Sequence, residues 1–461
     1  MEQFDLCIIG GGPAGYTAAG QAGAGGLKTA LIEKRALGGV CLNEGCIPSK
    51  TFLHSAKILD YAKTGDKYGV TVTGAGIDQG KVIQRKNKVI KVLVAGIKAK
   101  LNKAGVTMLS GTAVITGRET SGFIVTVDDT PIQAQHILLA SGSAPVIPPI
   151  PGVKEGIASE FVLTNREILD LTDIPPELVV VGGGVIGLEM ASYYNSAGSK
   201  VTVIEMLDKI AGLTENEISR ILLGNYKKKG VAFKLGCRVT GIGENSVSYE
   251  ENGVAQTISA DKVLLSIGRA PNTQGLGLEN IGVLTERGAV ITDNSMRTNV
   301  PGVYAAGDVN GKSMLAHTAY REAEVAVAQM LGGPDTMRYN AIPSVIYTNP
   351  EVAGVGETEE SAREKGLDIA VTALSMRYSG RYLAEVEGGD GVLRLIVDKK
   401  SNRLVGAHMI GSYVSEIIFG AAMMIDMALD IERVGEVTFP HPSVCEVLRE
   451  ALNGIGGTNI P

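Results

Sequence analysis

Cys41 and Cys46 lie in the segment LGGVCLNEGCIPSK, a few residues after a glycine-rich nucleotide-binding pattern. Two thiols beside a nucleotide-type cofactor suggest two-electron redox chemistry. In a regular helix their Cα atoms would be roughly 7.5 Å apart along the axis, so the backbone between them must bend before a disulfide can form. Gly45 permits that bend. Pro48 suits the first turn of a following helix, and the N-terminus of that helix favours a low thiol pKa.

A structural disulfide, half of a zinc site and two unrelated core cysteines are the alternatives for this pair. A zinc site needs four ligands, and only His54 follows nearby. A purely structural disulfide is disfavoured because the chain is long and its cysteine usage fits a reducing compartment. Cys7 is expected to be an ordinary core residue in the first strand. The flanking motifs favour a redox-active pair.

The nucleotide-binding pattern GxGxxG occurs twice, in CIIGGGPAG and VVVGGGVIG, with an offset of 172 residues. Each copy stands between a predicted strand and a predicted helix, and each is followed by a second strand that ends in an acid, Glu33 or Glu205. The patterned glycines are Gly10, Gly12 and Gly15 in the first copy and Gly182, Gly184 and Gly187 in the second. They permit the turn, the approach of a pyrophosphate and the packing of the helix on the strand.

The two acids are expected to accept hydrogen bonds from ribose hydroxyl groups. A carboxylate at Glu205 would also repel a 2′-phosphate, so the second copy favours NAD over NADP.

Length and composition indicate a large α/β protein. A chain of 461 residues exceeds one ordinary core, and its 60 glycines gather in turns between apolar runs. The net charge of −6 gives no electrostatic footprint for nucleic acid or an anionic membrane. A basic stretch at 81–103 predicts an amphipathic helix with a solvated face. Because the first strand begins almost at Met1 and no apolar run could span a bilayer, we expect a cytoplasmic protein without a membrane segment.

The expected fold class is α/β, with two Rossmann-like dinucleotide-binding domains and a C-terminal α+β dimerisation domain. The predicted divisions are 1–147, 148–272, a central segment 273–340, and 341–461. In the last part, GVLRLIVD and RLVGAHMIG predict an antiparallel hairpin, followed by a helix over 415–429. The apolar face of that helix fits core packing and a dimer interface equally well.

Through these motifs, the chain resembles the two-cysteine flavoprotein disulfide reductases. The resemblance runs from Asp5 to about Asn453 and includes HILLASGSAP, LLSIGRAPNT, VYAAGDV, MLAHTAYREA, SVIYTNPEVA and FPHPSVCE. It implies FAD on the first unit, NAD on the second, and oxidation of protein-bound dihydrolipoyl groups with reduction of NAD⁺ to NADH. Further cofactor contacts implied by the matching segments are Lys50, Gly142, Glu189, Gly268, Arg269 and Asp308.

The resemblance also assigns catalytic roles. Cys41 becomes the thiol that exchanges with substrate, Cys46 the thiol against the flavin, and His441 the base, with Glu446 fixing its tautomer. In the resembled family that base comes from the other subunit and a cis peptide precedes the proline that matches Pro442. A homodimer serving lipoyl-bearing proteins of a 2-oxo-acid dehydrogenase or glycine cleavage complex is therefore expected. His54 is the one serious rival as base, whereas His136, His317 and His408 are taken as ordinary residues.

Two positions depart from the resembled pattern. Glu44 places a negative charge between the cysteines where an apolar residue is common, which would raise the thiol pKa. Cys445 replaces a small hydroxyl residue and is expected to be inert. Two alternative functions are a nicotinamide-dependent reductase of another disulfide and a docking subunit of a multienzyme complex.

Overall fold

The computed structural model describes residues 1–455, so the last six residues of the predicted C-terminal domain lie outside the described residues. The chain forms two compact units, each assembled from three separate segments. The first compact unit contains Met1–Thr51, Gly80–Val146 and Gly268–Arg338, and the second contains Phe52–Gln79, Ile147–Ile267 and the chain from Tyr339 onward. The four-part division at 147, 272 and 340 stays a prediction.

The first compact unit is built on a seven-stranded sheet in the order β3-β2-β1-β6-β5-β4, with β19 paired to β6. Its strands are β1 Glu2–Ile9, β2 Thr29–Glu33, β3 Thr107–Ser110, β4 Ala113–Glu119, β5 Gly122–Val127, β6 Thr130–Leu139 and β19 Val303–Ala305. The strands around β1 run parallel, and β5 and β4 continue as an antiparallel edge. The second half of β1, residues 6–9, is a continuous apolar and buried run, as expected for a strand that is covered on both faces.

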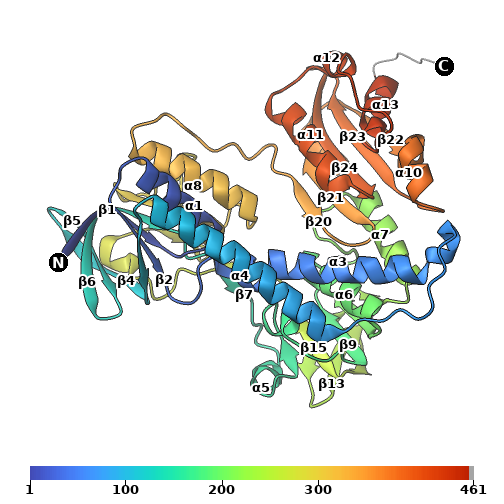
Figure 1. Cartoon of the computed structure of the whole chain (residues 1–461), viewed down its shortest axis with the longest axis horizontal. Coiled ribbons are helices and arrows are strands. Elements are labelled where there is room, and N and C mark those ends of the chain that lie inside the picture. The colour runs from blue at the N-terminus through green and yellow to red at the C-terminus, as the bar shows by residue number, and fades with distance from the viewer. Residues whose placement is uncertain (456–461) are drawn as a thin grey trace. The chain divides into compact units, whose positions relative to one another are not determined.

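Helices of the first compact unit pack on this sheet or carry the cysteines. They are α1 Pro13–Ala24, α2 Gly39–Glu44, the start of α3 Cys46–Lys63, α4 Gln79–Lys103 and α8 Ala316–Met330. In Figure 1, α1 and α8 lie side by side, and the Tyr16 and Tyr320 hydroxyls join them at 2.6 Å. The amphipathic helix predicted at 81–103 is confirmed as α4.

The second compact unit contains a parallel sheet in the order β11-β10-β9-β15-β8. Its strands are β8 Val162–Leu163, β9 Glu177–Val181, β10 Lys200–Glu205, β11 Ala232–Leu235 and β15 Lys262–Leu265. The associated helices are α5 Val153–Ala158, α6 Val185–Ala197 and α7 Asn216–Lys228. Between β11 and β15 the chain forms a three-stranded antiparallel sheet. Its strands are β12 Arg238–Ile242, β13 Ser246–Glu251 and β14 Val254–Ser259. The strand–turn–helix–strand repeat predicted from the two glycine patterns is thus present in both units.

The C-terminal part of the second compact unit is an antiparallel sheet in the order β20-β21-β24-β23-β22 with helices packed on it. The strands are β20 Ser344–Ile346, β21 Glu351–Gly356, β22 Ile369–Ser375, β23 Val392–Asp398 and β24 Arg403–Gly411. The helices are α9 Glu359–Glu364, α10 Gly380–Glu385, α11 Val414–Asp426, α12 Ile431–Gly435 and α13 Glu446–Ile455. The α/β fold class with a C-terminal α+β part is confirmed, as is the hairpin of β23 and β24.

The helix predicted at 415–429 is α11, and it ends earlier, at Asp426. One face, with Ile418, Ala421 and Ile425, is buried against the sheet. Phe419, Met423 and Met427 are exposed apolar side chains on the same segment. The structure therefore distinguishes two apolar surfaces on this segment, one packed in the core and one exposed. The sequence pattern alone could not distinguish them. Among the helices of residues 1–455, none is both long enough and apolar enough to cross a bilayer.

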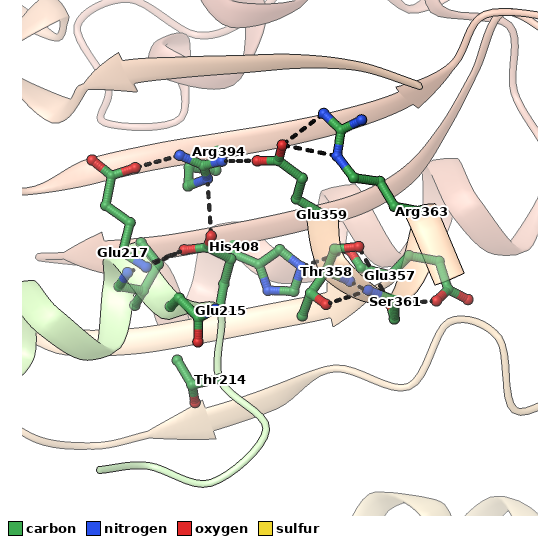
Figure 2. A network of polar contacts seen from close by, with 12 residues as sticks. Thr214, Glu215, Glu217, Glu357, Thr358, Glu359, Ser361, Arg363, Arg394 and His408 are labelled. Carbon is green, nitrogen blue, oxygen red and sulfur yellow. Dashed lines mark hydrogen bonds and ion pairs between the residues drawn. The ribbon is translucent and has the colours of Figure 1, made fainter. Parts of the chain in front are cut away.

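An ion-pair network joins α7, α9 and the C-terminal sheet within the second compact unit. Figure 2 shows Arg394 of β23 between Glu217 and Glu359. Its guanidinium lies 2.6 Å from the Glu359 carboxylate and 3.4 Å from that of Glu215, which caps α7. The Arg394 side chain is only 13 % exposed. A nearly buried cation in this position neutralises carboxylates that would otherwise repel one another.

Replacing Arg394 with Met is expected to lower the free energy of unfolding by about 3 kcal/mol, because the substitution leaves partly buried carboxylates without their counter-charge. Arg363→Met is the matched control. Arg363 also pairs with Glu359, at 2.8 Å, but its side chain is 63 % exposed, so its loss should cost about 0.5 kcal/mol or less. Urea unfolding of the flavin-loaded protein measures both, and equal losses would contradict the argument.

Candidate functional site

The first glycine turn lies between β1 and α1 and brings backbone atoms into close contact. Gly10 has a φ of +111°, and a Cβ on it would lie 2.3 Å from the Ala140 carbonyl oxygen. A Cβ on Gly15 would lie 1.8 Å from the Gly10 oxygen, so the third glycine lets α1 pack on the strand. The Glu33 carboxylate at the end of β2 accepts hydrogen bonds from the Gly11 and Arg35 N–H groups, at 2.8 and 2.7 Å.

The second glycine turn, between β9 and α6, repeats this geometry. Gly182 has a φ of +105°, and a Cβ on Gly187 would lie 2.3 Å from the Gly182 oxygen. The Glu205 carboxylate accepts hydrogen bonds from Gly183 N–H at 2.6 Å and Leu207 N–H at 2.8 Å. Both acids predicted to face ribose are therefore fixed by backbone donors at the ends of their strands.

The two turns fit a dinucleotide phosphate. Gly12 and Gly184 are the N-cap residues of α1 and α6, and neither offers a side chain to the free N–H groups of the first helical turn. A Cβ at Gly12 would meet nothing nearer than Gly39 at 3.8 Å, and one at Gly184 nothing nearer than Ser266 at 3.9 Å. Open space beside an uncapped helix N-terminus suits an anionic pyrophosphate.

The cysteine pair is a disulfide carried on two successive helices. Cys41 lies in α2 and Cys46 opens α3, and their Cα atoms are 4.7 Å apart. The bend expected between them occurs at Gly45, which has non-helical backbone angles. Pro48 lies in the first turn of α3, as predicted.

The segment that leads into α2 is fastened to the first glycine turn. Gly38 N–H donates to the Gly11 carbonyl at 2.8 Å. A Cβ on Gly39 would lie 2.6 Å from the Cα of Gly12. The disulfide is therefore attached to the turn that is shaped for a dinucleotide, within one compact unit.

A second group of predicted cofactor contacts surrounds a short ladder between β7 Ser143–Pro145 and β16 Arg269–Pro271. Ser143 Oγ donates to the Asp308 carboxylate, and Arg269 donates to Ser143 Oγ at 2.8 Å and to its carbonyl at 2.7 Å. Gly142 and Gly268 flank the ladder, both with positive φ. The structure thus brings these four predicted residues together around Ser143.

Ser143 was missed at the sequence level, although it follows Gly142 directly in HILLASGSAP. A serine in a turn carries no specific pattern. Glu322 of α8 was also missed, because a single glutamate inside a helix carries no specific pattern either. Its buried carboxylate accepts from Gly307 N–H at 2.6 Å and Asn310 Nδ2 at 2.9 Å. It holds the loop on which Asp308 stands.

His441 and Glu446 form a local pair at the start of α13. His441 Nδ1 lies 2.8 Å from Glu446 Oε1, and Ser443 N–H donates to Glu446 Oε2, also at 2.8 Å. Both hydrogen bonds lower the pKa of the Glu446 carboxyl below its usual range, and the bond from the Ser443 N–H has the larger effect. The carboxylate fixes the His441 ring and leaves its other nitrogen available, on a side chain that is 80 % exposed. The cis peptide expected before Pro442 is confirmed.

The remaining sulfur and imidazole groups fall into plainer roles. Burial raises the pKa of Cys7 to about 12, as suits a core thiol. Cys445 is a free thiol whose Sγ lies 3.0 Å from Ser443 Oγ; its inertness stays a prediction. His408 is buried, its Nε2 lies 2.8 Å from the Glu357 carbonyl, and burial lowers its pKa. His54 is exposed on α3 and stays a rival base.

Lys50 and Glu189, two of the predicted cofactor contacts, fall in different compact units, and their roles stay predictions. Lys50 lies one turn after Cys46 on α3. Glu189 is almost fully buried in α6 and accepts a hydrogen bond from Tyr347 N–H at 3.0 Å.

Comparison with known proteins agrees with this arrangement. The chain is 39 % identical over 456 residues to dihydrolipoyl dehydrogenase of Chlamydia muridarum, covering 98 % of this chain and 96 % of that protein. It is 38 % identical over 459 residues to the protein of the same name from Chlorobaculum tepidum, covering 97 % and 96 %. A solved structure of the HOCl-induced flavoprotein disulfide reductase RclA from Escherichia coli superposes with a TM-score of 0.85 at 30 % identity, covering 97 % of this chain and 99 % of that one.

Two family models divide almost the whole chain between them. Residues 4–323 match the pyridine nucleotide-disulphide oxidoreductases, and residues 342–452 match the dimerisation domain of the same group. The glycine turns, the disulfide and the C-terminal sheet all lie within the matched ranges. The chain therefore belongs to the pyridine nucleotide-disulphide oxidoreductase family.

Proposed function

We propose that this protein oxidises protein-bound dihydrolipoyl groups and reduces NAD⁺ to NADH, with FAD on the first glycine turn and NAD on the second. The observation that carries the proposal is the Cys41–Cys46 disulfide fastened to the first turn through Gly38 and Gly39. Relatives named dihydrolipoyl dehydrogenase, at 35–39 % identity over nearly the whole chain, support the choice of substrate.

The thiol chemistry balances on this chain's own cysteines. A dihydrolipoyl thiolate attacks Cys41 Sγ, the Cys41–Cys46 bond breaks, and Cys46 leaves as a thiolate. The second lipoyl thiol then attacks the mixed disulfide, which releases the oxidised lipoyl ring and leaves Cys41 reduced. FAD, when bound, supplies the two-electron transfer from the dithiol to NAD⁺. Asp308, held by Ser143, is the proposed ribitol contact.

We assign proton removal from the substrate thiol to His441, oriented by Glu446. The exposed imidazole and its fixed carboxylate match what a general base requires. We propose that the base acts in a homodimer, in which His441 of the partner subunit serves each disulfide. The dimerisation domain supports this assignment, as do the exposed apolar side chains of Phe419, Met423 and Met427 on α11.

The proposed partners are lipoyl-bearing proteins of a 2-oxo-acid dehydrogenase or glycine cleavage complex. The proposed location is the cytoplasm, since Cys7, Cys237 and Cys445 are free thiols, as a reducing compartment allows. A reductase of some other disulfide is not favoured by the names of the relatives. A pure docking subunit would have no use for a disulfide, a base and its carboxylate.

The flavin-loaded protein is expected to reduce NAD⁺ with dihydrolipoamide, and Cys46→Ser should lower that rate about a thousandfold or more, because no disulfide remains to accept electrons. Steady-state absorbance of NADH measures both. Oxidised glutathione with NADH is the comparison substrate, and faster turnover of that pair than of dihydrolipoamide with NAD⁺ would replace the proposed substrate.

Glu205→Gln is expected to reduce the preference for NAD⁺ over NADP⁺ in kcat/KM about tenfold, since a charge that repels the 2′-phosphate is removed. The internal repeat provides a matched control. Glu33→Gln removes the equivalent acid of the first turn, so it should weaken retention of FAD and leave the nicotinamide preference unchanged. A change of that preference in both variants would contradict the assignment of the two turns.

Glu446→Gln is expected to lower kcat/KM for dihydrolipoamide about a hundredfold, because the amide no longer holds the imidazole by an ionic hydrogen bond. The lowered pKa of Glu446 means that this bond is present throughout the neutral range and is lost only as the pH falls through that pKa. The wild-type advantage should therefore persist from pH 6 to pH 8. Glu450→Gln, a 45 % exposed carboxylate on the same helix, is the control and should leave the rate unchanged.

A further inference from the structure

Glu44, the acid between the two cysteines, is paired with an arginine from outside the cysteine segment. Arg35 Nη2 lies 2.6 Å from Glu44 Oε1, and Nη1 donates to the other carboxylate oxygen at 3.4 Å. Arg35 stands two residues beyond Glu33, in the connection between β2 and α2. The cation therefore reaches the last residue of the helix that carries Cys41.

The fold itself does not require an arginine at this position. Leu207 occupies the equivalent place in the second unit, at the 172-residue offset. Its N–H donates to Glu205 at 2.8 Å, just as the Arg35 N–H donates to Glu33 at 2.7 Å. The backbone alone makes the contact common to both turns. The Arg35 side chain is not needed for this shared contact. It binds Glu44 in the first compact unit, where the disulfide also lies.

The Glu44 carboxylate lies in the same short segment as both cysteines. It lies three residues after Cys41 and two before Cys46, and its side chain is 16 % exposed, so water screens it only partly. An uncompensated carboxylate near a dithiol disfavours the thiolate and raises the thiol pKa. A guanidinium that pairs with the carboxylate opposes that field.

We propose that Arg35 is a positioning residue that neutralises Glu44 and so keeps the reduced Cys41/Cys46 pair ionisable at neutral pH. The arginine acts through the carboxylate and touches neither sulfur. Its role rests on the proposed redox function of the cysteine pair. The guanidinium is 46 % exposed, so the compensation depends on ionic strength.

Four proteins test the inference: wild type, R35Q, E44Q and the double variant R35Q/E44Q. Each is prepared with its flavin, its disulfide is reduced with dithiothreitol, and the rate of iodoacetamide alkylation at each cysteine is followed against pH by mass spectrometry. The neighbouring charged groups, Glu33, Lys34 and Lys50, are common to all four proteins. The readout is the thiol pKa, which does not depend on turnover.

The expected shifts have opposite signs. R35Q removes the guanidinium from Glu44 and raises the pKa of the more acidic thiol by about one unit, so its alkylation slows about tenfold at pH values below that pKa. E44Q leaves Arg35 uncompensated and lowers the pKa by about half a unit. The double variant returns to the wild-type value. R35K, which keeps the charge, stays close to wild type, and added salt shrinks the R35Q shift.

A purely structural role for the pair predicts a different pattern. Both single variants would then shift the pKa in the same direction, the double variant would not recover, and salt would have no effect; any of these results, or an unchanged pKa in R35Q, overturns the inference. The proposed function is tested separately by wild-type oxidation of dihydrolipoamide. If that oxidation fails while the opposite shifts are found, the substrate assignment falls and the role of Arg35 stands.

Discussion

The contact between two pairs of glycines is the constraint on which the chemistry of the first compact unit depends. Gly38 and Gly39 approach the turn at Gly11 and Gly12 so closely that a Cβ on Gly39 would lie 2.6 Å from the Gly12 Cα. No side chain fits between the two segments. The cysteine helices are consequently held against a turn whose open helix N-terminus suits a pyrophosphate, and the disulfide lies on the segment that follows this contact.

The second glycine turn shows that this geometry alone does not specify redox chemistry. Both turns hold their acid through the same two backbone donors. In the second, the chain beyond Leu207 returns through Ala211, whose N–H donates to the Gly183 carbonyl at 2.8 Å. In the first, the equivalent return is made by Gly38 and leads into the cysteines. The repeated unit therefore provides a glycine turn in both cases. Only the segment packed on the first turn carries the cysteine pair.

Much of this arrangement could be predicted from the sequence because it is encoded locally. The glycine spacing, the bend at Gly45 and the pairing of His441 with Glu446 each involve residues within a short stretch of chain. Contacts between distant segments could not be predicted in the same way. Ser143 meets Asp308 across 165 positions, and neither residue shows by its type that it needs the other.

The pairing of Arg35 with Glu44 lies between these two cases. Glu44 was recognised as an unusual charge, but its partner lies nine residues earlier, beyond a turn and a short helix. A helical spacing rule connects residues three or four apart and does not reach it. The effect of Glu44 on the thiols was therefore predicted for an isolated charge, whereas the structure pairs that charge with a cation.

Two carboxylates thus serve the proposed reaction in different ways. Glu446 is held by the Ser443 N–H and binds the His441 ring, so its charge is directed at the base. Glu44 is bound by a cation, so its charge is withheld from the thiols. A base needs a fixed ring with a free nitrogen, and a thiol pair needs an environment that tolerates the thiolate. Arg35 and Glu44 lie in the first compact unit, and His441 and Glu446 lie in the second, so each pair forms within a single chain.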